Sequence, residues 1–183
     1  MKKTTILLIV IVLVALYVWS SYNGFVGANE AVDKQWAQVE TQYQRRFDLI
    51  PNLVESVKGI MKQEQKIFGD LAEARTRYSG ASSVTDKVNA ANQVESALSR
   101  LLVILENYPT LKSAENVQTL MAQLEGSENR ISVERQRFND DVRSLNVRVK
   151  RFPGNIVASV FGFNEREYFE AVSGAENAPE VKF

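Results

Sequence analysis

The sequence contains no cysteine and no histidine among its 183 residues. Without cysteine, the chain forms no disulfides, offers no thiolate nucleophile and binds neither iron–sulfur clusters nor zinc through thiolates. Without histidine, Ser-His-Asp catalysis, imidazole acid–base chemistry and His-ligated metal sites are excluded. Carboxylate, lysine, arginine, tyrosine and hydroxyl chemistry remains. We therefore expect a protein that is not an enzyme and that has no catalytic residue, no cofactor and no metal site.

An excess of charge is also missing, since 22 basic residues balance 22 acidic ones. Lys2 and Lys3 precede a long apolar run, so the chain beyond them carries 20 basic and 22 acidic residues, a net charge of about −2. A charge-balanced domain does not attract phosphate backbones over a distance. We therefore expect no nucleic-acid partner.

The apolar run extends from Ile6 to Trp19, and no charged residue lies between Lys3 and Glu30. As a helix, residues 4–22 span about 28 Å, close to the thickness of a bilayer's hydrocarbon core. Aromatic residues, which favour the headgroup region, gather at the end of this span: Tyr17, Trp19 and Tyr22. The sequence predicts a transmembrane helix at residues 4–22 in contact with membrane lipid, followed by a junction at 23–31.

A cleavable signal peptide is the alternative to an uncleaved anchor, because Val26, Gly27 and Ala28 resemble a small-residue cleavage site. The long, aromatic-rich stretch between the apolar run and that site favours the uncleaved anchor. The positive-inside bias of Lys2 and Lys3 places residues 1–3 in the cytoplasm and the following domain on the extracytoplasmic side.

Beyond the junction, apolar residues recur in alternating steps of four and three from Val32 to Tyr78. This spacing is typical of a long packed helix with coiled-coil-like contacts. The spacing keeps its register across Pro51, so we expect a kink there, or a tight break with near-collinear halves, rather than a domain boundary.

Two further long helices are predicted, near Asp86–Asn107 and Ser113–Arg151. Ser83 or Thr85 can cap the first of them, and Tyr108-Pro109 ends it. Phe152-Pro153-Gly154 stops the second, and a short apolar segment at residues 156–163 is expected to form a last helix. The fold class is therefore all-α, with three long helices and a short C-terminal helix after the transmembrane helix.

Four charged residues occupy apolar positions of these helices: Arg46, Glu64, Glu128 and Arg135. An unpaired charge there costs several kcal/mol, so we expect pairing across helices that fixes their register. Partner binding is one alternative. A Glu-based metal or catalytic site is another, although such bundle sites usually need Glu-x-x-His pairs.

Further polar candidates flank the predicted helix ends. Arg45 lies off the apolar positions and is expected in solvent, whereas Asp48 can cap a helix that restarts after Pro51. Glu106 and Asn107 belong to a helix stop in which Asn107 can bond its own backbone. The candidate structural or partner-binding residues are therefore Arg45, Arg46, Asp48, Glu64, Glu106, Asn107, Glu128 and Arg135.

Several strings in the chain closely resemble the LemA family. They are RRFDLIPNLV at residues 45–54 within the run from Val32, LENYPTLK at 105–112 and ENRISVERQRFN at 128–139. Tyr22-Asn23 and Phe152-Pro153 also match, whereas Phe138 and Leu145 stand where the family pattern has Tyr.

The resemblance implies a bacterial protein with an N-terminal membrane helix and an antiparallel helical bundle. The helical bundle is expected at residues 32–172, and the sequence itself predicts a flexible tail at 173–183. LemA-like genes often lie beside genes for membrane-associated proteins, including a metalloprotease, which suggests a link to envelope quality control. LemA-like proteins are often described with the short N-terminus outside, the opposite of the lysine-based orientation.

We therefore expect a single-pass protein of the bacterial inner membrane, with its domain on the periplasmic or extracytoplasmic side. Its expected role is that of a non-enzymatic scaffold or adaptor that forms homo-oligomers or binds an envelope protein. The alternatives are a Glu-based metal-binding or enzymatic bundle, and a secreted helical binding module released by cleavage near Ala28.

Overall fold

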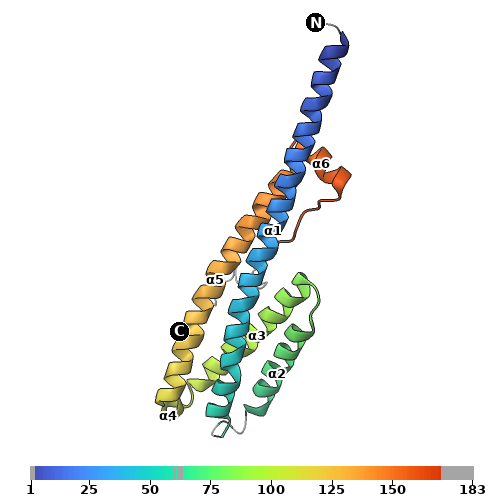
Figure 1. Ribbon diagram of the computed structural model, residues 1–183. Helices are drawn as coiled ribbons and strands as arrows, with labels where there is room; N and C mark the ends of the chain where they lie inside the picture. The colour runs from blue at the N-terminus through green and yellow to red at the C-terminus, as the bar shows by residue number, and fades with distance from the viewer. Residues whose placement is uncertain (1–2, 60, 62–63, 170–183) are drawn as a thin grey trace, which may run out of the picture. The chain divides into compact units, whose positions relative to one another are not determined.

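The computed structural model describes residues 3–59, 61 and 64–169, and these residues form helices without a strand (Figure 1). The helices are α1 (Lys3–Lys58), α2 (Gln65–Gly80), α3 (Val84–Leu105), α4 (Pro109–Lys112), α5 (Glu115–Lys150) and α6 (Gly154–Phe161). The expected all-α class is confirmed. The predicted tail at 173–183 lies outside the described residues.

The described residues divide into two units, and α1 and α5 each contribute to both. The first unit comprises residues 3–39 and 134–168, and the second comprises residues 40–133 with Phe169.

The first helix departs from the prediction at its end. Helix α1 continues through Pro51 and stops at Lys58, and α2 begins at Gln65, so one helix over 32–78 is wrong. Pro51 removes one backbone donor, but Ile50, Leu53 and Val57 are fully packed around it and hold the helix. Gly59 follows directly, and glycine is a poor helix former because its backbone loses the most freedom.

Helix α1 also runs unbroken through residues 23–31, which therefore form a helical connection from the apolar run to the rest of the chain.

The other helix ends follow local signals in the sequence. The Ser83 side chain accepts a hydrogen bond from the Asp86 backbone N–H at 3.0 Å and so caps α3, which ends at Leu105. Pro109 then opens the single turn α4, where its missing N–H costs no helical bond. At the far end, Gly162 closes α6 with φ of 76°, a conformation that favours glycine.

The second unit is built around apolar faces of α1, α2, α3 and α5, with α2 and α3 side by side (Figure 1). Aromatic rings join α1 to α2, since the centroids of Phe47 and Tyr78 are 4.7 Å apart and those of Tyr43 and Tyr78 are 5.6 Å apart. Tyr43 is completely buried. Burial of each such side chain contributes roughly 1.5–3 kcal/mol, so these contacts fix α2 against α1.

The first unit pairs the start of α1 with the end of α5. Trp36 and Phe138 pack edge to face at 5.4 Å, and Phe25 stacks on Phe163 at 5.1 Å. The buried Asn146 amide donates to the Arg166 carbonyl at 2.9 Å and accepts from the Arg166 N–H at 2.8 Å. These two bonds hold the segment after α6 against α5.

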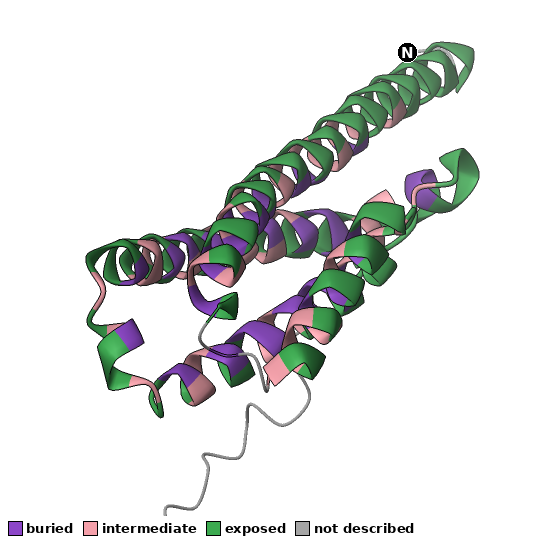
Figure 2. Ribbon diagram, turned by 90° about the horizontal axis from the view of Figure 1, so that it is seen from below, coloured by how far each residue is buried: buried purple, intermediate pink, exposed green. Residues whose placement is uncertain are grey.

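The N-terminal part of α1 is the one helix in the described chain that is long and apolar enough to cross a membrane. No residue of its apolar window is buried within the protein, as the green ribbon near the N-terminus shows (Figure 2). Length and composition therefore support the predicted span at residues 4–22.

Candidate functional site

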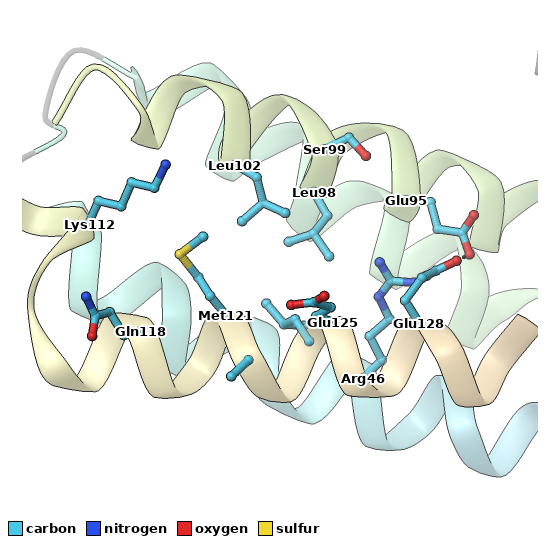
Figure 3. A pocket seen from close by; sticks show the side chains of 12 residues that line it. Arg46, Glu95, Leu98, Ser99, Leu102, Lys112, Gln118, Met121, Glu125 and Glu128 are labelled. Atoms are coloured by element: carbon cyan, nitrogen blue, oxygen red, sulfur yellow. Dashed lines mark hydrogen bonds and ion pairs between the residues drawn. The ribbon is translucent and has the colours of Figure 1, made fainter. Parts of the chain in front are cut away.

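Three helices of the second unit bring one arginine and two glutamates together (Figure 3). Arg46 comes from α1, Glu95 from α3 and Glu128 from α5. The Arg46 Nη1 atom lies 3.6 Å from Glu95 Oε1 and forms a hydrogen-bonded ion pair with Glu128 Oε2. These three residues are called the Arg46 cluster below.

The arginine of the cluster is buried because it occupies an apolar position of α1. Arg46 is 7% exposed, and the Tyr43 hydroxyl, one turn earlier, donates to Glu95 Oε1 at 3.3 Å. The Glu95 side chain is 17% exposed, whereas that of Glu128 is 43% exposed. The Arg46–Glu95 side of the cluster is therefore more buried than the Glu128 side, which opens to solvent.

One atom of the cluster is not satisfied. Arg46 Nε is buried and has no hydrogen-bond partner among the described residues. A buried donor without a partner costs about 1–3 kcal/mol. The two carboxylates offset the guanidinium charge, and the cluster joins three helices.

A pocket of about 650 Å³ adjoins the cluster (Figure 3). Its apolar wall is formed by Leu98, Leu102, Met121, Ala122 and Leu124. The Arg46 cluster lies at one end with Glu125 beside it, and Lys112 and Gln118 lie at the other end. A volume in the range of ligand pockets, with an apolar wall between charged ends, suits an amphipathic peptide or helix.

A second ion pair, between Lys87 of α3 and Glu40 of α1, lies in the same unit. Nearby, burial raises the pKa of the Tyr78 hydroxyl, and the negative charge of Glu40 raises it further. The Tyr78 hydroxyl has no hydrogen-bond partner among the described residues. With its pKa raised, Tyr78 stays neutral at physiological pH and does not act as a base there.

The structure brings two of the four charged residues on predicted apolar positions together, Arg46 and Glu128. Glu64 does not take part as expected, because it precedes α2 in the connection that follows α1 and lies at the N-cap without a side-chain cap bond. Arg135 is half-buried on α5 and belongs to the first unit.

The polar residues near the helix ends are exposed. Arg45 lines a different pocket, beside Gln42 and Arg130. The predicted capping role of Asp48 is wrong, because α1 does not restart there and Asp48 instead accepts from Gln44 Nε2 at 2.9 Å.

Glu106 and Asn107 lie at the helix stop after α3. Glu106 is the C-cap and pairs with Lys112 at 3.3 Å, while the Asn107 backbone N–H donates to the Ile104 carbonyl at 2.9 Å. Both residues therefore form contacts within the turn that leads into α4.

The sequence reading missed Glu95. It follows Val94, a buried residue of α3, and therefore lies at the edge of the apolar face. Charged residues at such flanking positions of packed helices often pair with a neighbouring helix, and this is the signal that points to it.

Within residues 3–59, 61 and 64–169, no three acidic side chains gather as metal ligands. In the Arg46 cluster, one guanidinium faces two carboxylates. This ion pairing links α1, α3 and α5.

The sequence model of the LemA family matches residues 35–183. Magnetosome proteins MamQ 2 and MamQ 1 of Paramagnetospirillum magneticum are each 25% identical to the chain over 175 residues. Magnetosome protein MamQ of Magnetospirillum gryphiswaldense is 28% identical over 174 residues. Each alignment covers 81% of this chain and 64% of the relative, so the chain spans less than two thirds of these proteins' length.

Proposed function

The chain belongs to the LemA family, and we propose that it is a membrane-anchored, non-enzymatic helical scaffold or adaptor of the bacterial envelope. The observation that carries this proposal is the bare apolar surface at the start of α1. There, large aliphatic side chains are 46% to 63% exposed: Ile6, Leu7, Leu8, Ile9, Val10, Ile11, Val12, Leu13, Val14 and Leu16. A continuous surface of this kind is stable in lipid and unfavourable in water.

Contacts of the first unit favour retention of the anchor over cleavage near Ala28. Cleavage there would cut inside α1 and remove Tyr22 and Phe25. Phe25 is 3% exposed and stacks on Phe163, and Tyr22 packs against Phe161 and Phe163. The segment before Ala28 is therefore part of the folded unit as well as a candidate membrane span.

The second unit supports the scaffold or adaptor role. Its pocket has an apolar wall, a net acidic end at Glu95, Glu125 and Glu128, and a basic end at Lys112. This pattern of charges gives an occupying helix a direction as well as a hydrophobic contact. The occupant is a second copy of this chain or an envelope protein, either of which a membrane tether concentrates locally. Lys2 and Lys3 precede the span, and by the positive-inside rule this position supports an extracytoplasmic domain.

Site-specific photo-crosslinking in cells tests the adaptor role. A photoreactive residue at Gln118, which is exposed in the pocket, is compared with one at Lys66, which is exposed on α2 outside that lining. We expect a discrete adduct from position 118 and none from 66, with the same species in native mass spectrometry of detergent-solubilised protein. A strict monomer with no adduct from either position would contradict the proposal.

A further inference from the structure

Helix α6 is apolar on two opposite sides. Its inner residues Val157 and Ala158 are 4% and 1% exposed, and the helix carries no charged residue. Its outer side is bare, with Ile156 56% exposed and Val160 72% exposed. Phe152, four positions before Ile156, is 75% exposed, and these three residues are called the α6 outer face. Phe152 lies just before the helix, and exposed apolar side chains that gather in this way mark a contact surface.

Helix α6 packs where the apolar run of α1 ends (Figure 1). Tyr22 lies 5.0 Å from Phe161 between ring centroids and 5.7 Å from Phe163. At 1.5 Å per residue, Tyr22 lies about 4.5 Å beyond Trp19 along α1. If the run spans the hydrocarbon core, this contact places α6 in the headgroup layer, which is roughly 5–7 Å deep on each side of a bilayer.

Basic side chains lie at the same level. The Arg148 Nη1 atom donates to the Gly24 carbonyl of α1 at 3.4 Å, and Arg151 is exposed just after α5. These two arginines, Tyr17 and Phe152 help to line a pocket of about 450 Å³. Exposed apolar residues beside arginines are the pattern of a helix that lies on an anionic bilayer.

We propose that the α6 outer face rests in the membrane interface, with Arg148 and Arg151 beside the phosphates of anionic lipid headgroups. This proposal rests on the proposed membrane anchoring and adds a second lipid contact to it. A second copy of the chain is a poorer occupant of this surface, because face-to-face packing would bring the arginines of both copies together.

Depth-dependent fluorescence quenching tests this contact in the full chain, which has no native cysteine. Single variants Val160→Cys, Leu13→Cys and Gln136→Cys carry an environment-sensitive fluorophore. Each is reconstituted into vesicles of phosphatidylethanolamine and phosphatidylglycerol with spin-labelled lipids. Gln136 is the matched water-exposed control, because it lies on α5 about 18 Å before Arg148. We expect quenching at positions 160 and 13 and none at 136.

The possible outcomes separate the two proposals. Quenching at position 13 with position 160 behaving like 136 overturns the α6 contact and leaves the anchor in place. An unquenched but blue-shifted probe at 160 means that protein covers the face, and this also overturns the contact. Absence of quenching at position 13 overturns the anchoring itself.

Two sets of variants resolve the roles of the apolar and basic residues. Ile156→Gln with Val160→Gln removes apolar area at exposed positions, so it should abolish quenching of a probe at Phe152→Cys while helicity and flotation stay unchanged. Arg148→Gln with Arg151→Gln should make quenching at position 160 insensitive to the phosphatidylglycerol content. Unchanged quenching in the first variant would contradict the contact, and an unchanged lipid dependence in the second would contradict the arginines' role.

Discussion

The two units of the molecule treat apolar and charged side chains in opposite ways. In the described chain, all exposed large apolar residues except Val103 and Val133 belong to the first unit, and most of them lie at the start of α1 and around α6. Apart from these two valines, the large apolar residues of the second unit are buried or half-buried, and the charged side chain of Arg46 is buried among them. Because α1 contributes to both units, one helix changes from a lipid-compatible surface to a water-compatible one along its length.

The largest expected effect is the loss of membrane association when charges are placed in the apolar run of α1. Val10→Arg with Val12→Arg should shift the protein from the membrane to the soluble or degraded fraction, because each arginine at a span's centre costs roughly 2.5–3.5 kcal/mol. Membrane fractionation measures the shift. Val103→Arg with Val133→Arg is the matched control at exposed valines of the second unit, and it should leave fractionation unchanged. If both double variants fractionated alike, the proposed distinction between the two units would be contradicted.

The Arg46 cluster provides the next largest effect. Glu95→Ala should lower the free energy of unfolding by about 2–3 kcal/mol, because the buried Arg46 would lose the more buried of its two carboxylate partners. Glu128→Ala should cost about 1 kcal/mol or less, since that side chain is 43% exposed. Chemical unfolding of the detergent-solubilised chain, followed by circular dichroism, measures both. Glu106→Ala, at an exposed ion pair, is the control, and an equal loss in all three variants would refute a specific role for the cluster.

A smaller effect tests the continuity of α1 in the second unit. Pro51→Ala should raise the free energy of unfolding by about 1 kcal/mol, because it restores a backbone donor inside a helix that is already formed. Asn52→Ala at the neighbouring exposed position should change it by less. Destabilisation by Pro51→Ala would indicate that the helix is interrupted there.

The smallest effect concerns Tyr78 and appears at high pH. Its folded-state pKa is raised, so the folded chain holds a proton that the unfolded chain loses above a pH of roughly 10. Stability therefore falls as pH rises beyond that value, and Tyr78→Phe should remove this part of the fall. Unfolding curves of wild type, Tyr78→Phe and the control Tyr108→Phe at pH 8 and above measure it. Identical alkaline slopes in wild type and Tyr78→Phe would contradict the account.

The sequence predicted those parts of the fold that depend on local chemistry. Ser83 and the Tyr108-Pro109 and Phe152-Pro153 pairs act on their own backbone neighbourhood, so the ends of α3 and α5 could be read directly. The end of α1 could not, because it depends on tertiary packing that holds the helix through Pro51 and on a break at Gly59 inside a continuous apolar pattern.

The candidate site was predictable only where a charge interrupts an apolar pattern. Arg46 and Glu128 carry that signal, whereas Glu95 lies beside the pattern and needs the arrangement of three helices to reveal it. The α6 outer face was hidden for the opposite reason. The sequence of a short helix without charges predicts a buried helix, and only the structure shows that Ile156 and Val160 are exposed.

We propose that the N-terminal apolar run remains in the mature protein as a bilayer anchor. Alkaline carbonate extraction of cell membranes, followed by intact mass measurement, tests it most directly. We predict a carbonate-resistant protein with the 20.6 kDa mass of the full chain. A soluble protein whose mass shows cleavage near Ala28 would contradict the account.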